Sequence, residues 1–200
     1  VLLNITAGTD AQSDARRQAA EDAGALPQIV AAMRAFPATA AVQESACGAM
    51  SNITAGTDAQ GDARKQAAAD AGALPQIVAA MRAPSATAAV QESACEALAS
   101  ITAGTHAQGD VRKQAAADAG ALPQIVDAMR AHSAVAAVQE WACEGLINIT
   151  AGKDARRDAR AQVAVAEGAL SLLKALQKHT DSAVRERAGI LHDDLAKLHA

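Results

Sequence analysis

Apolar residues recur along this chain at spacings of three and four, and glycines interrupt them at regular points. Within the stretch 72–104 a first apolar set contains Leu74, Ile77, Val78 and Met81, and a second contains Val90, Ala94, Ala97, Leu98 and Ile101. Such spacing puts each set on one face of a helix. Gly72 is expected to end an earlier helix in a left-handed conformation, and Gly104 to cap the second helix. The stretch therefore predicts two amphipathic helices joined by a bend.

The same stretch is repeated along the chain. The triplet Asn-Ile-Thr or its variant Ser-Ile-Thr starts at intervals of 48 residues, at Asn4, Asn52, Ser100 and Asn148. Glycines follow the same interval at Gly24, Gly72, Gly120 and Gly168. A fixed period of this length indicates a solenoid, in which each unit buries its apolar face only against its neighbours. Residues 51–98 and 99–146 are nearly identical, which indicates recent duplication or a consensus-like design.

Each unit is expected to contain one short and two longer helices. In the first complete unit these are Ala15–Ala23, capped by Ser13 or Asp14, then Leu26–Ala35 and Thr39–Ala55. The third helices of the next units are expected at Thr87–Ala103 and Val135–Ala151. The chain thus divides into the end of a truncated preceding repeat and four units, namely 1–8, 9–56, 57–104, 105–152 and 153–200.

The last unit departs from the pattern. Its third helix, AVRERAGILHDDLAKLHA, is far more charged than the others, so we expect unit 153–200 to act as a C-terminal cap with Ala200 near the natural end. At the other end, Leu2, Leu3 and Ile5 are expected to cover the first repeat only partly. A weak homodimer through this truncated N-terminal end follows as a hypothesis.

The segments GALPQIV, VQESACEAL and NITAG together resemble the armadillo-repeat family, over essentially the whole chain and with units somewhat longer than is usual there. The resemblance implies an all-α, right-handed superhelical solenoid of armadillo-like three-helix repeats. It also implies that the third helices line a concave groove for an extended peptide, whose backbone an Asn side chain holds. That Asn corresponds here to Asn4, Asn52 and Asn148, with Ser100 and Asp194 at the departing positions.

Other residues on the same helical face differ between units. One turn before the Asn, where importin-like members have Trp, this chain has Gly48, Glu96, Glu144 and Ile190. Seven residues before the Asn stand Ser45, Ser93, Trp141 and Arg187. A lone Trp among near-identical units is either an exposed groove anchor or a cover for an Ala-rich neighbour. Glu44, Glu92 and Glu140 flank this face, so with Glu96 and Glu144 it is expected to be acidic.

The net charge and the aromatic content narrow the classes of partner that this chain is expected to bind. A net charge of −4, one Phe, one Trp and no Tyr argue against nucleic acid, which requires basic surfaces and stacking rings. No apolar run is long enough to suggest a membrane span.

The repeated basic pairs Arg16-Arg17, Arg64-Lys65, Arg112-Lys113 and Arg156-Arg157, each near an Asp, are expected to form a solvated, self-neutralised edge. Cys47, Cys95 and Cys143 are expected to be buried free thiols, which favours a location in the cytoplasm or nucleus.

These observations favour a non-catalytic scaffold that binds an extended, basic peptide along the third helices. The proposed groove residues are Asn4, Ser45, Asn52, Ser93, Glu96, Ser100, Trp141, Glu144, Asn148 and Arg187. The alternative is a structural, self-assembling or consensus-designed solenoid without a specific peptide ligand. An enzyme is disfavoured because the histidines do not recur in register, and no motif for a cofactor or metal is evident.

Overall fold

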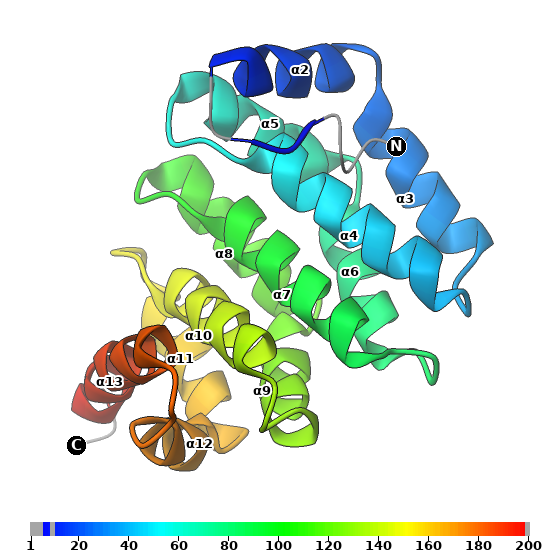
Figure 1. Ribbon diagram of the computed structural model, residues 1–200. Coiled ribbons are helices and arrows are strands. Elements are labelled where there is room, and N and C mark those ends of the chain that lie inside the picture. Colours follow the sequence, from blue (N-terminus) through cyan, green and yellow to red (C-terminus); the bar gives the residue numbers. More distant parts are fainter. Residues whose placement is uncertain (1–5, 9–10, 199–200) are drawn as a thin grey trace.

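The computed structural model describes residues 6–8 and 11–198, and this part of the chain is helical throughout, without strands (Figure 1). The helices form four successive triplets: α2 (Ala11–Asp22), α3 (Ala25–Ala35) and α4 (Ala40–Thr54); α5 (Ala59–Asp70), α6 (Ala73–Arg82) and α7 (Ala88–Thr102); α8 (Ala107–Asp118), α9 (Ala121–Ala131) and α10 (Ala136–Thr150); α11 (Arg157–Ala166), α12 (Ala169–Leu176) and α13 (Ser182–Lys197). The all-α repeat fold predicted from the sequence is confirmed. Leu2, Leu3 and Ile5, on which the dimer hypothesis depends, lie outside the described residues.

Corresponding helices of successive triplets pack side by side. The third helices α4, α7, α10 and α13 form one row, and the second helices α3, α6, α9 and α12 form another (Figure 1). Helices α2 and α13 lie at opposite ends of the array. Each triplet therefore contacts mainly its neighbours, as in other solenoids, and the third helices present one continuous surface.

Glycine sets the boundary between the first and second helix of every triplet. Gly72 has φ 82° and ψ 29°, and the glycines at 24, 120 and 168 have similar left-handed angles, as predicted. The predicted cap of the first helix is wrong, because α2 already includes Ala11 and Ser13 is buried. In the next triplet the cap is Asp58, whose carboxylate accepts a hydrogen bond of 2.7 Å from the Gly61 amide.

The core lies between the rows and consists of the apolar sets that the spacing predicted. Ile77, Leu98 and Ile101 are fully buried in the second triplet, and their counterparts are buried in the third. Cys47, Cys95 and Cys143 are free and buried, as predicted, and burial raises the pKa of the Cys47 and Cys143 thiols to about 12. Their expected slow reaction with thiol reagents stays a prediction.

A repeated glutamine joins the second helix of each triplet to the third. The side-chain amide of Gln91 donates a hydrogen bond of 2.9 Å to the carbonyl of Met81, near the end of α6. Gln43 and Gln139 make the equivalent bonds, of 3.0 Å, to Met33 and Met129. Because the last carbonyls of a helix have no partner within it, these amides satisfy groups that would otherwise be buried without a hydrogen bond.

Most of the basic residues of the expected solvated edge are buried, which contradicts that expectation for Arg17, Arg64, Lys65, Arg112 and Lys113, whereas Arg156 is exposed. Arg112 is 0% exposed and donates hydrogen bonds to the carbonyls of Ile101 (2.8 Å) and Ala103 (2.9 Å), at the end of α7. Arg64 and Arg160 make the same pair of bonds in their units. Arg160, and not Arg156, is thus the fourth-unit counterpart. The reason is geometric, since the turn after each third helix leaves its last carbonyls facing the next first helix.

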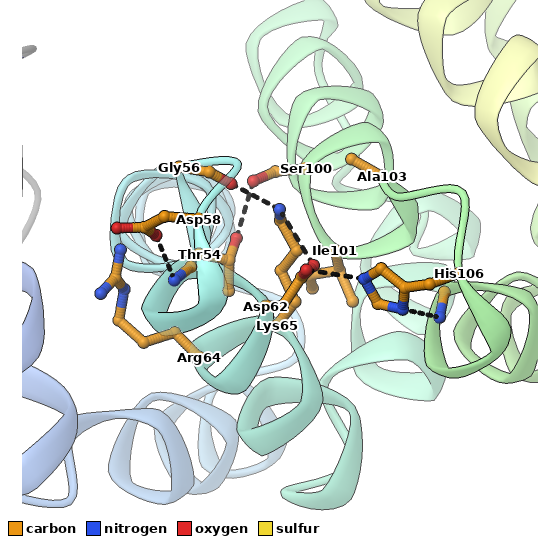
Figure 2. A network of polar contacts seen from close by, with 12 residues as sticks. Thr54, Gly56, Asp58, Asp62, Arg64, Lys65, Ser100, Ile101, Ala103 and His106 are labelled. Carbon is orange, nitrogen blue, oxygen red and sulfur yellow. Dashed lines mark hydrogen bonds and ion pairs between the residues drawn. The ribbon is translucent and has the colours of Figure 1, made fainter.

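The expected pairing of these cations with nearby Asp residues is present, and it extends between units. Figure 2 shows the network around Asp62 of α5, whose carboxylate lies 3.7 Å from Lys65 and 2.6 Å from His106. The same carboxylate accepts a hydrogen bond of 3.3 Å from Arg112 of the next triplet. The opposite ring nitrogen of His106 caps α8 at the Gly109 amide. Asp62 therefore links the first helices of two successive units.

Stability should depend on the ionised state of Asp154, which stands in the last unit at the position of Asp58 and His106. Two hydrogen bonds from Arg160, of 2.7 and 3.0 Å, lower the pKa of Asp154 to about 2. Because this value lies below that of the unfolded chain, the folded state binds fewer protons at the carboxylate. Its contribution is therefore complete above about pH 4 and is lost as the pH falls through about 2.

Asp154→Asn is accordingly expected to lower the free energy of unfolding by about 1–2 kcal/mol at pH 7, and by progressively less between pH 4 and pH 2. Urea unfolding at several pH values measures this difference. Asp158→Asn, at an exposed carboxylate in the first turn of α11, is the control. A penalty of Asp154→Asn that does not change with pH would contradict the assignment.

Candidate functional site

A hollow of about 430 Å3 lies on the row of third helices. We call it the helix-three groove, and it is lined by Gly8, Arg17, Ser51, Asn52, Ala55, Glu96, Ala99, Ser100, Ala103, Trp141, Glu144 and Asn148. Six of the ten proposed site residues, from three different units, thus line one surface: Asn52, Glu96, Ser100, Trp141, Glu144 and Asn148. Asn4 lies outside the described residues. Ser45 and Ser93 are on α4 and α7, and Arg187 is on α13, but none of the three lines this hollow.

The Asn and Ser side chains of the groove bind the neighbouring third helix. Asn148 donates a hydrogen bond of 3.0 Å from Nδ2 to the carbonyl of Ala99 on α7. Ser100, at the same position one unit earlier, lies 2.8 Å from the Thr54 hydroxyl and bonds to the carbonyl of Ser51 on α4. Within the described chain the Asn148 amide makes no other hydrogen bond, so its oxygen and second N–H stay available. The bond to Ala99 orients the amide toward the groove.

Glu96 contributes negative charge to the groove. It lies on α7, is half-buried, and makes no ion pair with any of the residues that the structure describes. Burial raises its pKa; the nearby carboxylate of Glu92 adds to the rise, while a hydrogen bond with the Ser51 side chain opposes it. A carboxylate in this state gains stability when a cation approaches, because its own surroundings do not compensate its charge.

The acidic side chains of α10 differ from Glu96, because Arg187 of α13 pairs with both of them and offsets one of their two negative charges. Its guanidinium lies 3.1 Å from Glu140 and 3.1 Å from Glu144. The negative charge of this face is therefore smaller at α10 than at α7, but its sign is the same. The sequence alone does not identify Arg187 as the partner of these glutamates, because the register of α13 against α10 depends on how the two helices pack.

Trp141 stands at the junction between these two charge environments. It lines the groove from α10, is partly exposed, and packs against the edge of the core. The ring thus covers its neighbours, as one interpretation expects, and also presents a face to the groove, while its role as a ligand anchor stays a prediction. An indole with one buried and one exposed side is a typical anchor for a ligand.

Two other hollows lie along the first helices. One, of about 600 Å3, is between α5 and the start of α8, and one of about 520 Å3 is between α8 and the loop before α11. Their floors are alanine, and the carboxylates of Asp62 and Asp154 on their walls already pair with Arg112 and Arg160. Although larger, they offer a ligand fewer unpaired polar groups than the helix-three groove.

Residues 6–8 and 11–198 contain neither a metal-ligand cluster nor a membrane-spanning helix. Among these residues, no group of three or more His, Cys, Asp or Glu side chains is placed to hold a metal ion. None of the described helices has the length and apolar character required to cross a bilayer.

A family comparison identifies the repeats. The family model described as the LRRK2 ARM repeat matches residues 5–189, which is most of the chain. The chain is an armadillo-repeat protein. Its helix triplets are therefore armadillo repeats, and the helix-three groove lies on the surface that the resemblance pointed to. A comparison with curated proteins gives no match.

Solved armadillo structures resemble the chain along nearly its whole length. An engineered protein with a crystal structure is 30% identical, with a TM-score of 0.78 over 98% of this chain and 72% of its own. A designed armadillo repeat protein in complex with the peptide (KR)4 is 26% identical, with a TM-score of 0.75 over 97% and 72%. Computationally designed armadillo repeat proteins for modular peptide recognition give 29% identity and a TM-score of 0.76 over 96% and 71%.

Proposed function

We propose that this armadillo array is a non-catalytic scaffold that binds an extended peptide with basic side chains along the helix-three groove. The observation that carries the proposal is the gathering of Glu96, Trp141 and Asn148 from two adjacent repeats in one hollow. Each offers a different contact to a peptide: a carboxylate for a cation, a ring for an aliphatic stem, and an amide for the main chain. The similar designed protein in complex with (KR)4 supports the same ligand class.

The repeat spacing sets the length of such a ligand. Packed helices lie about 10 Å apart, and an extended chain advances about 3.3 Å per residue. Four repeats therefore match a peptide of about 10–12 residues, with about three residues for each repeat. The Asn148 oxygen and its free N–H can bond one N–H and one carbonyl of that peptide.

A fluorescent 12-residue peptide rich in Lys and Arg tests the proposal. We expect saturable binding that weakens with added salt, because the groove carboxylates are accessible to counterions. Glu96→Gln should weaken binding by about tenfold, since it removes one charge-assisted contact. Asp127→Ala is the matched control; it removes an exposed carboxylate from α9 and restores the Ala that stands at residues 31 and 79. Equal binding of an acidic 12-mer would contradict the proposal.

The second candidate is a structural or self-assembling solenoid with no specific ligand. The near-identity of residues 51–98 and 99–146 and the likeness to engineered proteins favour it. Absence of binding to both basic and acidic peptides, with the array folded, would select this alternative. Sedimentation at rising concentration tests the weak homodimer through residues 1–8, which stays a prediction. We also propose a cytoplasmic or nuclear location, which the free buried thiols support.

A further inference from the structure

The charge of the third-helix surface changes between the second and the third repeat. Glu92 and Glu96 of α7 make no ion pair within the described residues. Glu140 and Glu144, at the same positions of α10, share Arg187 of α13 at 3.1 Å each. A cationic side chain would therefore be attracted at α7, whereas at α10 it would compete with a guanidinium that already holds the same carboxylates.

Apolar surface appears where the negative charge ends. Trp141 lines the groove from α10. Ile190 of α13 is 57% exposed, and it follows Val184 by as many residues as Glu144 follows Val138 and Glu96 follows Val90. The position that holds a carboxylate in the second and third repeats thus holds an exposed isoleucine in the fourth. Few large apolar side chains of the described chain are this exposed, and this one stands at the repeat position that Glu96 and Glu144 occupy in the groove.

We infer that the groove selects a peptide of two chemistries, with basic side chains against α7 and apolar side chains against Trp141 and Ile190. This inference rests on the proposed peptide-binding function and specifies its ligand. A uniformly basic peptide would place cations beside Arg187, which already offsets half of the charge of Glu140 and Glu144, and beside Ile190, which replaces the carboxylate of the earlier repeats. A mixed peptide buries apolar surface there instead.

The repeat spacing fixes the separation of the two parts. At about three peptide residues per repeat, side chains that face Glu96 and Ile190, two repeats apart, stand about six residues apart in the peptide. The side chain that faces Trp141 lies between them. The ligand is thus a segment with one or two Lys or Arg residues and with aliphatic residues about three and about six positions away from them, which face Trp141 and Ile190.

Four labelled 12-residue peptides test the inference: one uniformly Lys/Arg-rich, one with a basic half followed by a Leu/Ile-containing half, one with the halves reversed, and one acidic. We expect one of the two mixed orders to bind about tenfold more tightly than the uniformly basic peptide. Both orders are needed because either peptide direction satisfies the spacing. Binding is measured by fluorescence anisotropy at low and moderate salt.

Arg187→Gln is the decisive variant. By releasing Glu140 and Glu144, it should strengthen binding of the uniformly basic peptide by about threefold to tenfold and remove the preference for the mixed peptide. Lys174→Gln, which removes the same charge from the exposed face of α12, is the control and should change neither. Urea unfolding of both variants confirms that each array is folded.

The possible failures are distinct. If the uniformly basic peptide binds at least as tightly as both mixed peptides, or if Arg187→Gln leaves the preference unchanged, the inference is wrong while the proposed function stands. If none of the peptides binds, or the acidic one binds equally, the proposed function fails together with it.

Discussion

Replacement of Arg112 by methionine is expected to lower the free energy of unfolding by about 2–5 kcal/mol. Methionine has a similar length and fills most of the same space, so the loss reports on polar contacts more than on packing. It removes the donors to the carbonyls of Ile101 and Ala103, which end α7. Each buried carbonyl left without a donor costs about 1–3 kcal/mol. Asp62 would keep Lys65 and His106 as partners, so no carboxylate is left without a neighbouring positive or donor group.

Chemical unfolding followed by circular dichroism measures this effect, and Arg156→Met is the control because Arg156 is exposed. Arg112→Lys is an informative second variant. Lysine keeps the charge but not the planar fork that reaches two carbonyls at once, so it should recover less than half of the loss. If Arg112→Met changed the unfolding free energy by less than about 1 kcal/mol, water rather than the guanidinium would have to satisfy the end of α7.

The buried arginines also explain why the groove has a fixed shape. Arg112 bonds to the end of α7 while its own helix, α8, begins the next repeat, and it reaches Asp62 of the previous first helix. One side chain thus joins three elements from two repeats. Since the loop after each third helix carries the last groove residues, we expect variants of Arg112 to disturb ligand binding even though Arg112 lies outside the groove.

The sequence was sufficient for the helices and the core but not for these polar contacts. The spacing of Leu74, Ile77 and Met81 and the left-handed Gly72 depend only on local preferences, which the printed residues display. Arg112 was interpreted as solvent-exposed because an Asp lies close to it in sequence, and that local pairing is real. What local reasoning could not supply is that a turn brings unpaired carbonyls, from residues 101 and 103, against the same side chain.

For the groove, too, the sequence was sufficient for the residues on its surface but not for the contacts that they make. Alignment of the repeats brought Glu96, Trp141 and Asn148 to one face, and they do line one hollow. Two details required the packing of neighbouring repeats. The acceptor of Asn148 is the carbonyl of Ala99, a full repeat earlier, and the partner of Glu144 is Arg187, nearly a repeat later. The glutamates repeat uniformly in the sequence, but in the folded array the negative charge of the third-helix surface decreases at α10.

Trp141→Ser is expected to weaken peptide binding by about thirtyfold, which corresponds to about 2 kcal/mol. Aromatic side chains in partly buried positions contribute most to binding when a ligand covers them, and Trp141 is the only tryptophan of the chain. The variant should stay folded, because serine stands at the same position in the two preceding repeats, at Ser45 and Ser93. Circular dichroism checks this.

The tryptophan also reports directly on where the ligand binds. With one Trp and no Tyr in the chain, the emission comes from the groove, and a peptide that covers the indole should shift it to shorter wavelength. Trp141→Phe should keep most of the affinity, since a phenyl ring retains the apolar contact. The double variant Trp141→Ser, Ser93→Trp moves the ring by one repeat, or about 10 Å, and should shift the preferred position of the apolar peptide residue by about three. Saturable binding that neither changes the emission nor responds to Trp141→Ser would place the ligand elsewhere on the solenoid.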